Sequence, residues 1–151
     1  MIDDLTGLMN YRGLRIQIKK IIRNCPVFTL VLIDIDNFKS FNKQGYSLGD
    51  EVLKEFISFL KKTVPDDALI VRFRIGDEFI IILKNTNQPD AEKQISSIRT
   101  KCLNHSFHCL NQFTDYGISF TSGIVQYTNE YNSLEKLIGE AENRMNKLSK
   151  I

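Results

Sequence analysis

The stretch VLIDID at residues 31–36, together with RIGDEFIIIL at residues 74–83, decides the fold of this chain. Each stretch sets acidic residues beside a run of apolar β-formers, which is typical of a strand buried on both faces of a sheet. Carboxylates at the end of a buried sheet are costly unless a cation meets them, so the pattern indicates a metal site. The acids concerned are Asp34, Asp36, Asp77 and Glu78.

Oxygen ligands on rigid strands suit Mg²⁺ or Mn²⁺. Mg²⁺ takes one or two protein carboxylates and leaves its other positions to water and substrate phosphates. The chemistry indicated is nucleotidyl or phosphoryl transfer, in which two ions about 3.5–4 Å apart activate the attacking hydroxyl and stabilise the leaving phosphate. The alternative is that these are ordinary strand-end acids facing solvent. Two acidic pairs together favour the metal, because residues 79–83 form a continuous apolar run.

Length and composition limit the number of domains and the classes of protein to which this chain can belong. With 151 residues, the chain is predicted to form a single domain over residues 1–151. A net charge of +2 on 20 basic and 18 acidic residues argues against a nucleic-acid partner, which would need a clustered basic face. No apolar stretch approaches the roughly 18 residues of a membrane span, and the N-terminus lacks a leader pattern. We therefore expect no membrane segment in this chain and a cytoplasmic location, where its three cysteines would stay reduced.

Periodicity along the chain predicts alternating helices and strands. Amphipathic spacing predicts helices over residues 10–23, 48–64, 89–103 and 133–145. β-rich runs predict strands over residues 27–35, 68–74, 78–84 and 116–127. Turn-forming residues predict turns over residues 38–47 and a helix end with a loop over residues 105–115. This order predicts an α/β (α+β) fold, with a mainly antiparallel central sheet of about five strands flanked by helices.

Five motifs in a fixed order give the chain a resemblance to a known family. They are DDLTGLMNYRGL at residues 3–14, LIDIDNFKSFN at 32–42, GYSLGDEVL at 45–53, RIGDEFIIIL at 74–83 and ISFTSGI at 118–124. Together they resemble the motifs of the GGDEF domain, the diguanylate cyclase family, whose fold is related to the palm of nucleotide polymerases. The resemblance extends from Asp3 to about Lys150. A lone GDEF would be a weak signal, whereas five ordered motifs are a strong one.

The resemblance implies roles for the acidic residues. Asp34 and Asp77 would ligate two metal ions, with help from the Ile35 carbonyl. Asp77 and Glu78 would be the catalytic acids, and Glu78 would either assist the metal site or activate the attacking 3′-hydroxyl.

The resemblance also implies a GTP site. Lys39 would reach the triphosphate, and the backbone N–H groups of the turn at Phe38 and Lys39 would add to it, since turn amides bind anions. Asn42 and Asp50 would bind guanine, because a carboxylate accepts from the N1–H and N2–H₂ groups while an amide meets the acceptor edge. Gly76 would let the backbone come close to the nucleotide.

Among the departures from the family pattern, three concern nucleotide or product binding. The two successive glycines of the family signature stand here as Ile75–Gly76, so either isoleucine replaces a glycine or one glycine is missing. The product-inhibition motif would fall at residues 66–69, where this chain has DDAL, so no inhibitory site is expected. The usual phosphate-binding lysine is Ser149 here. Lys147 or Lys150 would replace it, although a solvated surface role is the alternative.

The activity implied is that of a nucleotidyl cyclase, which condenses two GTP into cyclic di-GMP and releases pyrophosphate. Each domain would hold one GTP, so a homodimer would be required and catalysis would depend on proximity and metal electrostatics. An N-terminal sensor or a partner protein would bring the domains together. Two alternatives remain: a degenerate domain that binds GTP or a partner without catalysis, and a variant cyclase that makes a different cyclic dinucleotide.

Overall fold

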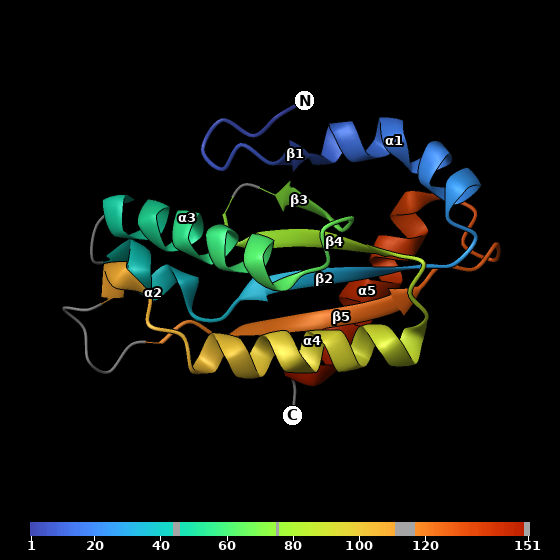
Figure 1. Ribbon diagram of the computed structural model, residues 1–151. Helices are drawn as coiled ribbons and strands as arrows, with labels where there is room; N and C mark the ends of the chain where they lie inside the picture. Colours follow the sequence, from blue (N-terminus) through green and yellow to red (C-terminus); the bar gives the residue numbers. More distant parts are fainter. Residues whose placement is uncertain (44–45, 75, 111–116, 150–151) are drawn as a thin grey trace.

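The computed structural model describes residues 1–43, 46–74, 76–110 and 117–149, and its strands form one sheet (Figure 1). The strands are β1 (Met9–Asn10), β2 (Phe28–Ile35), β3 (Leu69–Arg74), β4 (Glu78–Lys84) and β5 (Phe120–Gln126). Their order across the sheet is β1-β3-β4-β2-β5, in which β1 is parallel to β3 and the other neighbours are antiparallel. The predicted sheet of about five mainly antiparallel strands is confirmed.

Helices cover both faces of this sheet (Figure 1). The helices α3 (Tyr46–Thr63) and α4 (Gln88–Leu103) pack on one face, and α1 (Tyr11–Asn24) and α5 (Leu134–Ser149) pack on the other. These helices confirm the four that amphipathic spacing predicts, with ends that differ by at most four residues. Among the described residues, no helix combines the length and the apolar character needed to cross a membrane.

The central strands β2 and β4 are buried on both faces because successive side chains alternate between them. Val31 and Ile33 of β2 belong to the core beneath α3 and α4, whereas Leu30 and Leu32 belong to the core beneath α1 and α5. By the same alternation, Asp34 at the end of β2 lies on the α1/α5 face. The apolar runs of the sequence therefore place the first acid at the end of the most buried strand.

A short helix, α2 (Phe38–Lys43), follows β2 where the sequence predicted turns. The prediction of turns over residues 38–47 was wrong for this part, because Phe38 and Phe41 lie three residues apart and both bury against the core. Burial of two aromatic rings on one helix face outweighs the weak helix propensity of the Asn and Ser residues around them. Residues 44 and 45 lie outside the described residues.

The segment over residues 105–127 also differs from the prediction, though less than α2 does. The strand predicted over residues 116–127 is shorter, since β5 begins at Phe120. Residue 116 and much of the predicted loop over residues 105–115 lie outside the described residues. The described part of that loop contains one 3₁₀ turn, η1 (His108–Leu110).

The helix α5 lies very close to β5. A Cβ at Gly123 would collide with the backbone carbonyl oxygen of Ala141, so glycine is required for this approach. The close packing carries the last turns of α5, including Met145 and Asn146, to the end of β2 where Asp34 lies.

The N-terminal turn is fastened to β3 and to the hairpin. The backbone N–H and the hydroxyl of Thr6 both donate to the Asp3 carboxylate, at 2.9 and 2.6 Å. The Arg72 guanidinium donates to both Asp3 oxygens, at 3.1 and 3.0 Å, and to the Gly76 carbonyl at 3.0 Å. Burial alone would raise the pKa of Asp3, but the hydrogen bonds from Thr6 and Arg72 lower it below its ordinary value. This arrangement holds one side of the β3–β4 hairpin in place.

Candidate functional site

An open cavity of about 500 Å³ lies where β2 ends, between α2 and the last turns of α5. It is lined by Asp34, Ile35, Asp36, Asn37, Phe38, Lys39, Ser40, Lys43, Asp77, Thr121, Met145 and Asn146. Among these are Asp36 of the acidic pattern and five residues to which the family resemblance gives a metal or GTP role, namely Asp34, Ile35, Phe38, Lys39 and Asp77. Residues far apart in the sequence thus meet at one point of the sheet.

Asp34 lies at the centre of an acidic group. The strand register sets it opposite Glu78, and Asp77 lies beside Glu78 at the hairpin tip. The Oδ1 atom of Asp34 is buried and has no hydrogen-bond partner among the described residues. Burial, followed by hydrogen bonding with Asp77 and by the charges of Asp77, Glu78 and Asp36, raises the pKa of Asp34 to about 8. A cation placed among these carboxylates would relieve both the burial and the repulsion.

The hairpin tip is tied to the end of β2 by backbone. The Ile35 N–H donates to the Asp77 carbonyl oxygen at 3.1 Å, which holds Asp77 beside Asp34. Two adjacent carboxylates, one with an unpartnered buried oxygen, form an oxygen donor set of the kind that Mg²⁺ prefers. Within the described ranges, no three or more His, Cys, Asp or Glu side chains are grouped to hold a metal ion. The donor set therefore fits an ion that takes its remaining ligands from water and phosphate.

Asp36 differs from Asp34 in its hydrogen bonds, although both residues line the cavity. Its two carboxylate oxygens accept hydrogen bonds from the Ser119 hydroxyl at 2.8 Å and the Thr121 hydroxyl at 2.6 Å. These bonds join the end of β2 to β5 and orient the carboxylate. Asp36 therefore contributes negative charge to the cavity, while its oxygens are already used within the chain.

Glu78 lies outside the lining of the cavity and is held by an ion pair. Its carboxylate is 3.3 Å from the Arg74 guanidinium, which also reaches Glu142 of α5 at 3.2 Å. The Arg74 guanidinium lies over the Phe73 ring, 4.5 Å from the centroid. Sequence reasoning missed the links to Arg74 and Glu142, because Glu142 is 68 residues away and nothing local marks it.

Positive charge faces the acids from α2. Lys39 and Lys43 both line the cavity, one helical turn apart. Sequence reasoning did not assign Lys43, because the i, i+4 spacing with Lys39 has no meaning in a segment taken for turns. Asn37, with φ of 57°, turns the chain from β2 into α2, a conformation that asparagine tolerates well. The N–H groups of Phe38 and Lys39 in the first turn have no acceptor within the helix.

Asn42 and Asp50, the predicted guanine-binding pair, lie near one another but outside the cavity lining. Asn42 packs against Gly49 of α3, where a Cβ would collide with the Asn42 amide oxygen. Asp50 is the next residue of α3, and both Asn42 and Asp50 are exposed. The small size of Gly49 thus lets the amide approach the helix that carries Asp50.

Gly76 and Lys147 also lie outside the lining of this cavity. Gly76 has φ of 120°, a backbone conformation that favours glycine, and a Cβ there would meet nothing within 4 Å. Lys147 is exposed near the end of α5, and its neighbour Asn146 lines the cavity instead. Ile75, the other variant position of the hairpin, lies outside the described residues, as does Lys150.

Comparison with known proteins identifies a family and a shared fold. The family model "Diguanylate cyclase, GGDEF domain" matches residues 1–150. The response regulator PleD of Caulobacter vibrioides is 35% identical over 133 residues, which cover 80% of this chain and 29% of PleD. The diguanylate cyclase DgcS of Shewanella oneidensis is 29% identical over 153 residues, which cover 94% of this chain and 49% of DgcS. The chain therefore spans less than a third of PleD and about half of DgcS.

A solved structure shares the fold. The GGDEF domain of DgcB from Caulobacter crescentus, crystallised in complex with c-di-GMP, has a TM-score of 0.84 and 20% sequence identity. The match covers 99% of this chain and 87% of that chain. The five-stranded sheet with helices on both faces is thus the architecture of that domain.

Proposed function

Because the chain belongs to the GGDEF domain family of diguanylate cyclases, we propose that it condenses two GTP into cyclic di-GMP and releases pyrophosphate, with Mg²⁺ or Mn²⁺ as cofactor. The observation that carries the proposal is the unpartnered buried Oδ1 of Asp34 beside Asp77. The same cavity holds Lys39 and Lys43. Acids that need a cation and lysines that attract phosphate together suit a metal–triphosphate ligand.

In this proposal Asp34, Asp77 and the Ile35 carbonyl hold the metal. When bound, the metal neutralises charge on the triphosphate and activates the attacking 3′-hydroxyl. Glu78 assists the metal site or accepts the proton of that hydroxyl, and its ion pair with Arg74 fixes where its carboxylate lies.

The triphosphate lies along α2 in this proposal. Lys39 and Lys43 neutralise its charge, and the N–H groups of Phe38 and Lys39 bind its oxygens. Asn42 and Asp50 bind the guanine edge, and Gly76 leaves room for the nucleotide. Lys147, which is exposed and lies outside the cavity lining beside Asn146, contributes least to phosphate binding.

Catalysis in this proposal requires two domains. Each cavity holds one GTP, so the 3′-hydroxyl of one nucleotide attacks the α-phosphate of the other only when two cavities face each other in a homodimer. An N-terminal sensor or a separate partner protein would control that pairing. GTP is the substrate and the cytoplasm, which supplies it, is the proposed location.

A second candidate is a domain that binds GTP or a partner without turnover. The observation that favours it is that Glu78 is already paired with Arg74, while Lys147 lies outside the cavity lining. A cyclase that makes a different cyclic dinucleotide is a further alternative, since isoleucine occupies the signature at residue 75.

One experiment separates these candidates. The purified protein is incubated with Mg²⁺ and each of the four ribonucleoside triphosphates, singly and in pairs, and products are identified by mass spectrometry. We expect cyclic di-GMP from GTP alone, and none from the Asp34→Asn variant, while the exposed-site control Asp67→Asn matches the wild type. A different dinucleotide would favour the variant cyclase. GTP binding in calorimetry without product would favour the binding domain, and absence of GTP binding would overturn the proposal.

A further inference from the structure

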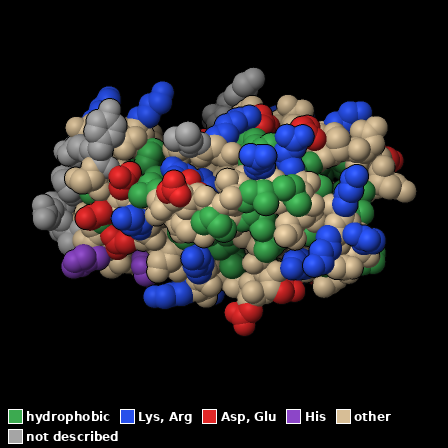
Figure 2. Space-filling model, turned by 90° about the horizontal axis from the view of Figure 1, so that it is seen from above, with side chains coloured by type: hydrophobic (Ala, Val, Ile, Leu, Met, Phe, Trp, Pro, Cys, Tyr) green, Lys and Arg blue, Asp and Glu red, His purple; other side chains and the backbone are tan. Residues whose placement is uncertain are grey.

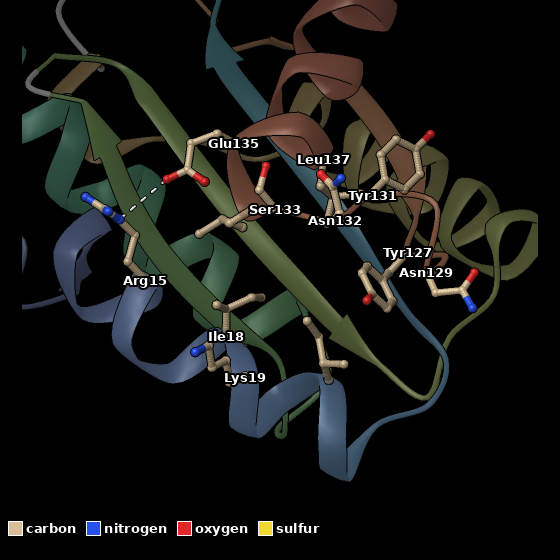
Figure 3. Close-up of a pocket in the computed structure, with 12 residues that line it drawn as sticks. Arg15, Ile18, Lys19, Tyr127, Asn129, Tyr131, Asn132, Ser133, Glu135 and Leu137 are labelled. Atoms are coloured by element: carbon tan, nitrogen blue, oxygen red, sulfur yellow. Dashed lines mark ion pairs between the residues drawn. The ribbon is translucent and has the colours of Figure 1, made fainter.

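A second cavity, of about 320 Å³, lies between α1 and the segment that leads from β5 into α5 (Figure 3). It shares no lining residue with the cavity at the end of β2. The two cavities lie at opposite ends of α5, since Leu134 and Leu137 line this one whereas Met145 and Asn146 line the first. Nothing in the proposed cyclase reaction uses it.

Part of the lining of the second cavity is apolar and packs on the core. Ile18 and Ile22 of α1 are partly buried, and Leu134 and Leu137 of α5 are buried in the same core. Such an apolar lining, with a few polar groups around it, is the usual composition of a small-molecule site. A volume near the lower end of the range for such sites limits the ligand to a small molecule.

Tyr127 forms a flat wall of this cavity. Its ring is stacked on Phe28, with centroids 4.8 Å apart and planes only 8° from parallel. Phe28 covers one face of the ring, and Tyr127 lines the cavity. A tyrosine ring fixed from behind is a stacking surface for a planar aromatic ligand.

The polar groups around the cavity are of two kinds. At one end Glu135 pairs with Arg15 at 3.5 Å and accepts from the Tyr11 hydroxyl at 3.1 Å, so those charges are already balanced. Lys19 has no hydrogen-bond or ion-pair partner among the described residues. The side-chain amides of Asn129 and Asn132 are equally free of such partners within the described part of the chain.

Figure 2 views the molecule from above Figure 1, the side on which α1 lies. Apolar surface on this side is bordered by several Lys and Arg side chains. Asp and Glu side chains lie on the same face, so the positive charge available to an anionic ligand is local to the border of this apolar surface.

We propose that the second cavity binds a mononucleotide. The base stacks on Tyr127, the amide of Asn132 bonds to its polar edge, and the Lys19 ammonium binds the phosphate. An amide can donate and accept at once, which matches the mixed donors and acceptors of a base edge. The proposal is independent of the cyclase function, because it uses none of the residues assigned to GTP turnover.

Calorimetry and NMR with AMP and UMP, without divalent metal, test this proposal. We expect saturable binding, with amide shifts in α1 and in residues 127–137 and none in residues 34–43. Adenosine and inorganic phosphate each lack half of the ligand and should bind at least about ten-fold more weakly, the effect of losing one charge-assisted bond or one stacked ring. Failure of both AMP and UMP to bind, or shifts confined to residues 34–43, would overturn the proposal.

Matched variants locate the site. Lys19→Gln should weaken AMP binding about ten-fold, whereas Lys20→Gln, at an exposed neighbour outside the cavity, should leave it unchanged. Tyr127→Phe keeps the ring and should retain most of the affinity, whereas Tyr127→Leu should lose it. Because Tyr127 packs on Phe28, thermal unfolding of each variant is measured alongside. Equal affinities for Lys19→Gln and Lys20→Gln would reject the assignment even where the leucine variant fails to fold.

Discussion

Two aspartates beside the same sheet differ in how their carboxylates are satisfied. Asp3, in the N-terminal turn, accepts hydrogen bonds from Thr6 and Arg72 on both of its oxygens, and its pKa is lowered. Asp34, at the end of β2, has a buried oxygen without a partner among the described residues, and its pKa is raised to about 8. The first carboxylate has partners for both oxygens within the chain, whereas the second has a buried oxygen without one in the described part of the chain.

This contrast separates an acid that stabilises the fold from an acid that we propose to be functional. A buried carboxylate whose oxygens accept hydrogen bonds favours the folded state, whereas one whose oxygens lack hydrogen-bond partners disfavours it. Carboxylates of the second kind are typical of functional sites. Asp36 makes the distinction sharper, because it lines the same cavity as Asp34 and yet both of its oxygens are bonded to hydroxyls. Position in a cavity alone therefore does not identify a metal ligand.

The largest expected effect is on turnover. Replacing Asp34 by Asn removes a negative ligand from the proposed metal site and should lower Mg²⁺-dependent cyclic di-GMP formation at least about 100-fold. The rise in melting temperature that Mg²⁺ and GTP together produce in the wild type should disappear as well. Asp36→Asn should leave most of this rise in place. Unchanged turnover in Asp34→Asn would remove Asp34 from the site.

On the other side of the comparison, Asp3→Asn should cost about 3 kcal/mol of unfolding free energy, because it leaves Arg72 buried without a counter-charge. The side chains of Asp3 and Arg72 are only 19% and 8% exposed. Asp4→Asn, at the exposed neighbour, should change stability by less than about 0.5 kcal/mol. Urea denaturation measures both variants, and equal small effects would show that the Asp3 clamp is dispensable.

The pH dependence of stability gives a third test. Unfolded Asp titrates near pH 3.9, and folded, metal-free Asp34 near 8. Because the folded pKa is the higher one, the folded state holds an extra proton between these values, so unfolding free energy falls as pH rises from about 4 to about 8. Asp34→Asn lacks this fall, and its melting temperature should gain on the wild type across the window. A constant difference in metal-free buffer would contradict the raised pKa.

The smallest effect is expected at the ion pair between Arg74 and Glu142. Both side chains are accessible, 55% and 32% exposed, so Glu142→Gln should cost less than about 1 kcal/mol. This variant is informative when compared with Asp3→Asn, which breaks the buried ion pair between Asp3 and Arg72 of β3. Chemical denaturation compares the two directly, and a loss as large as that of Asp3→Asn would show that burial is not what distinguishes them.

Local sequence predicted most elements because burial leaves a periodic trace. The runs at residues 31–36 and 78–84 indicated strands buried on both faces, and β2 and β4 have that burial. The prediction of turns over α2 was wrong for a physical reason. The helix has only six residues and two buried aromatic side chains, so its sequence pattern is dominated by turn-forming residues. That failure also concealed Lys43, whose place in the cavity depends on the helix.

The sequence by itself determined the sheet, its layers and the residue types of the proposed metal site, because alternation and motif order are local properties. Only the tertiary structure decided which acid is unpartnered. Asp34 and Asp36 are two residues apart and chemically identical, but Ser119, directly before β5, and Thr121 of β5 donate their hydroxyls to Asp36, and the hairpin brings Asp77 to Asp34. Such partners come from segments more than 40 residues away, so local sequence does not specify them.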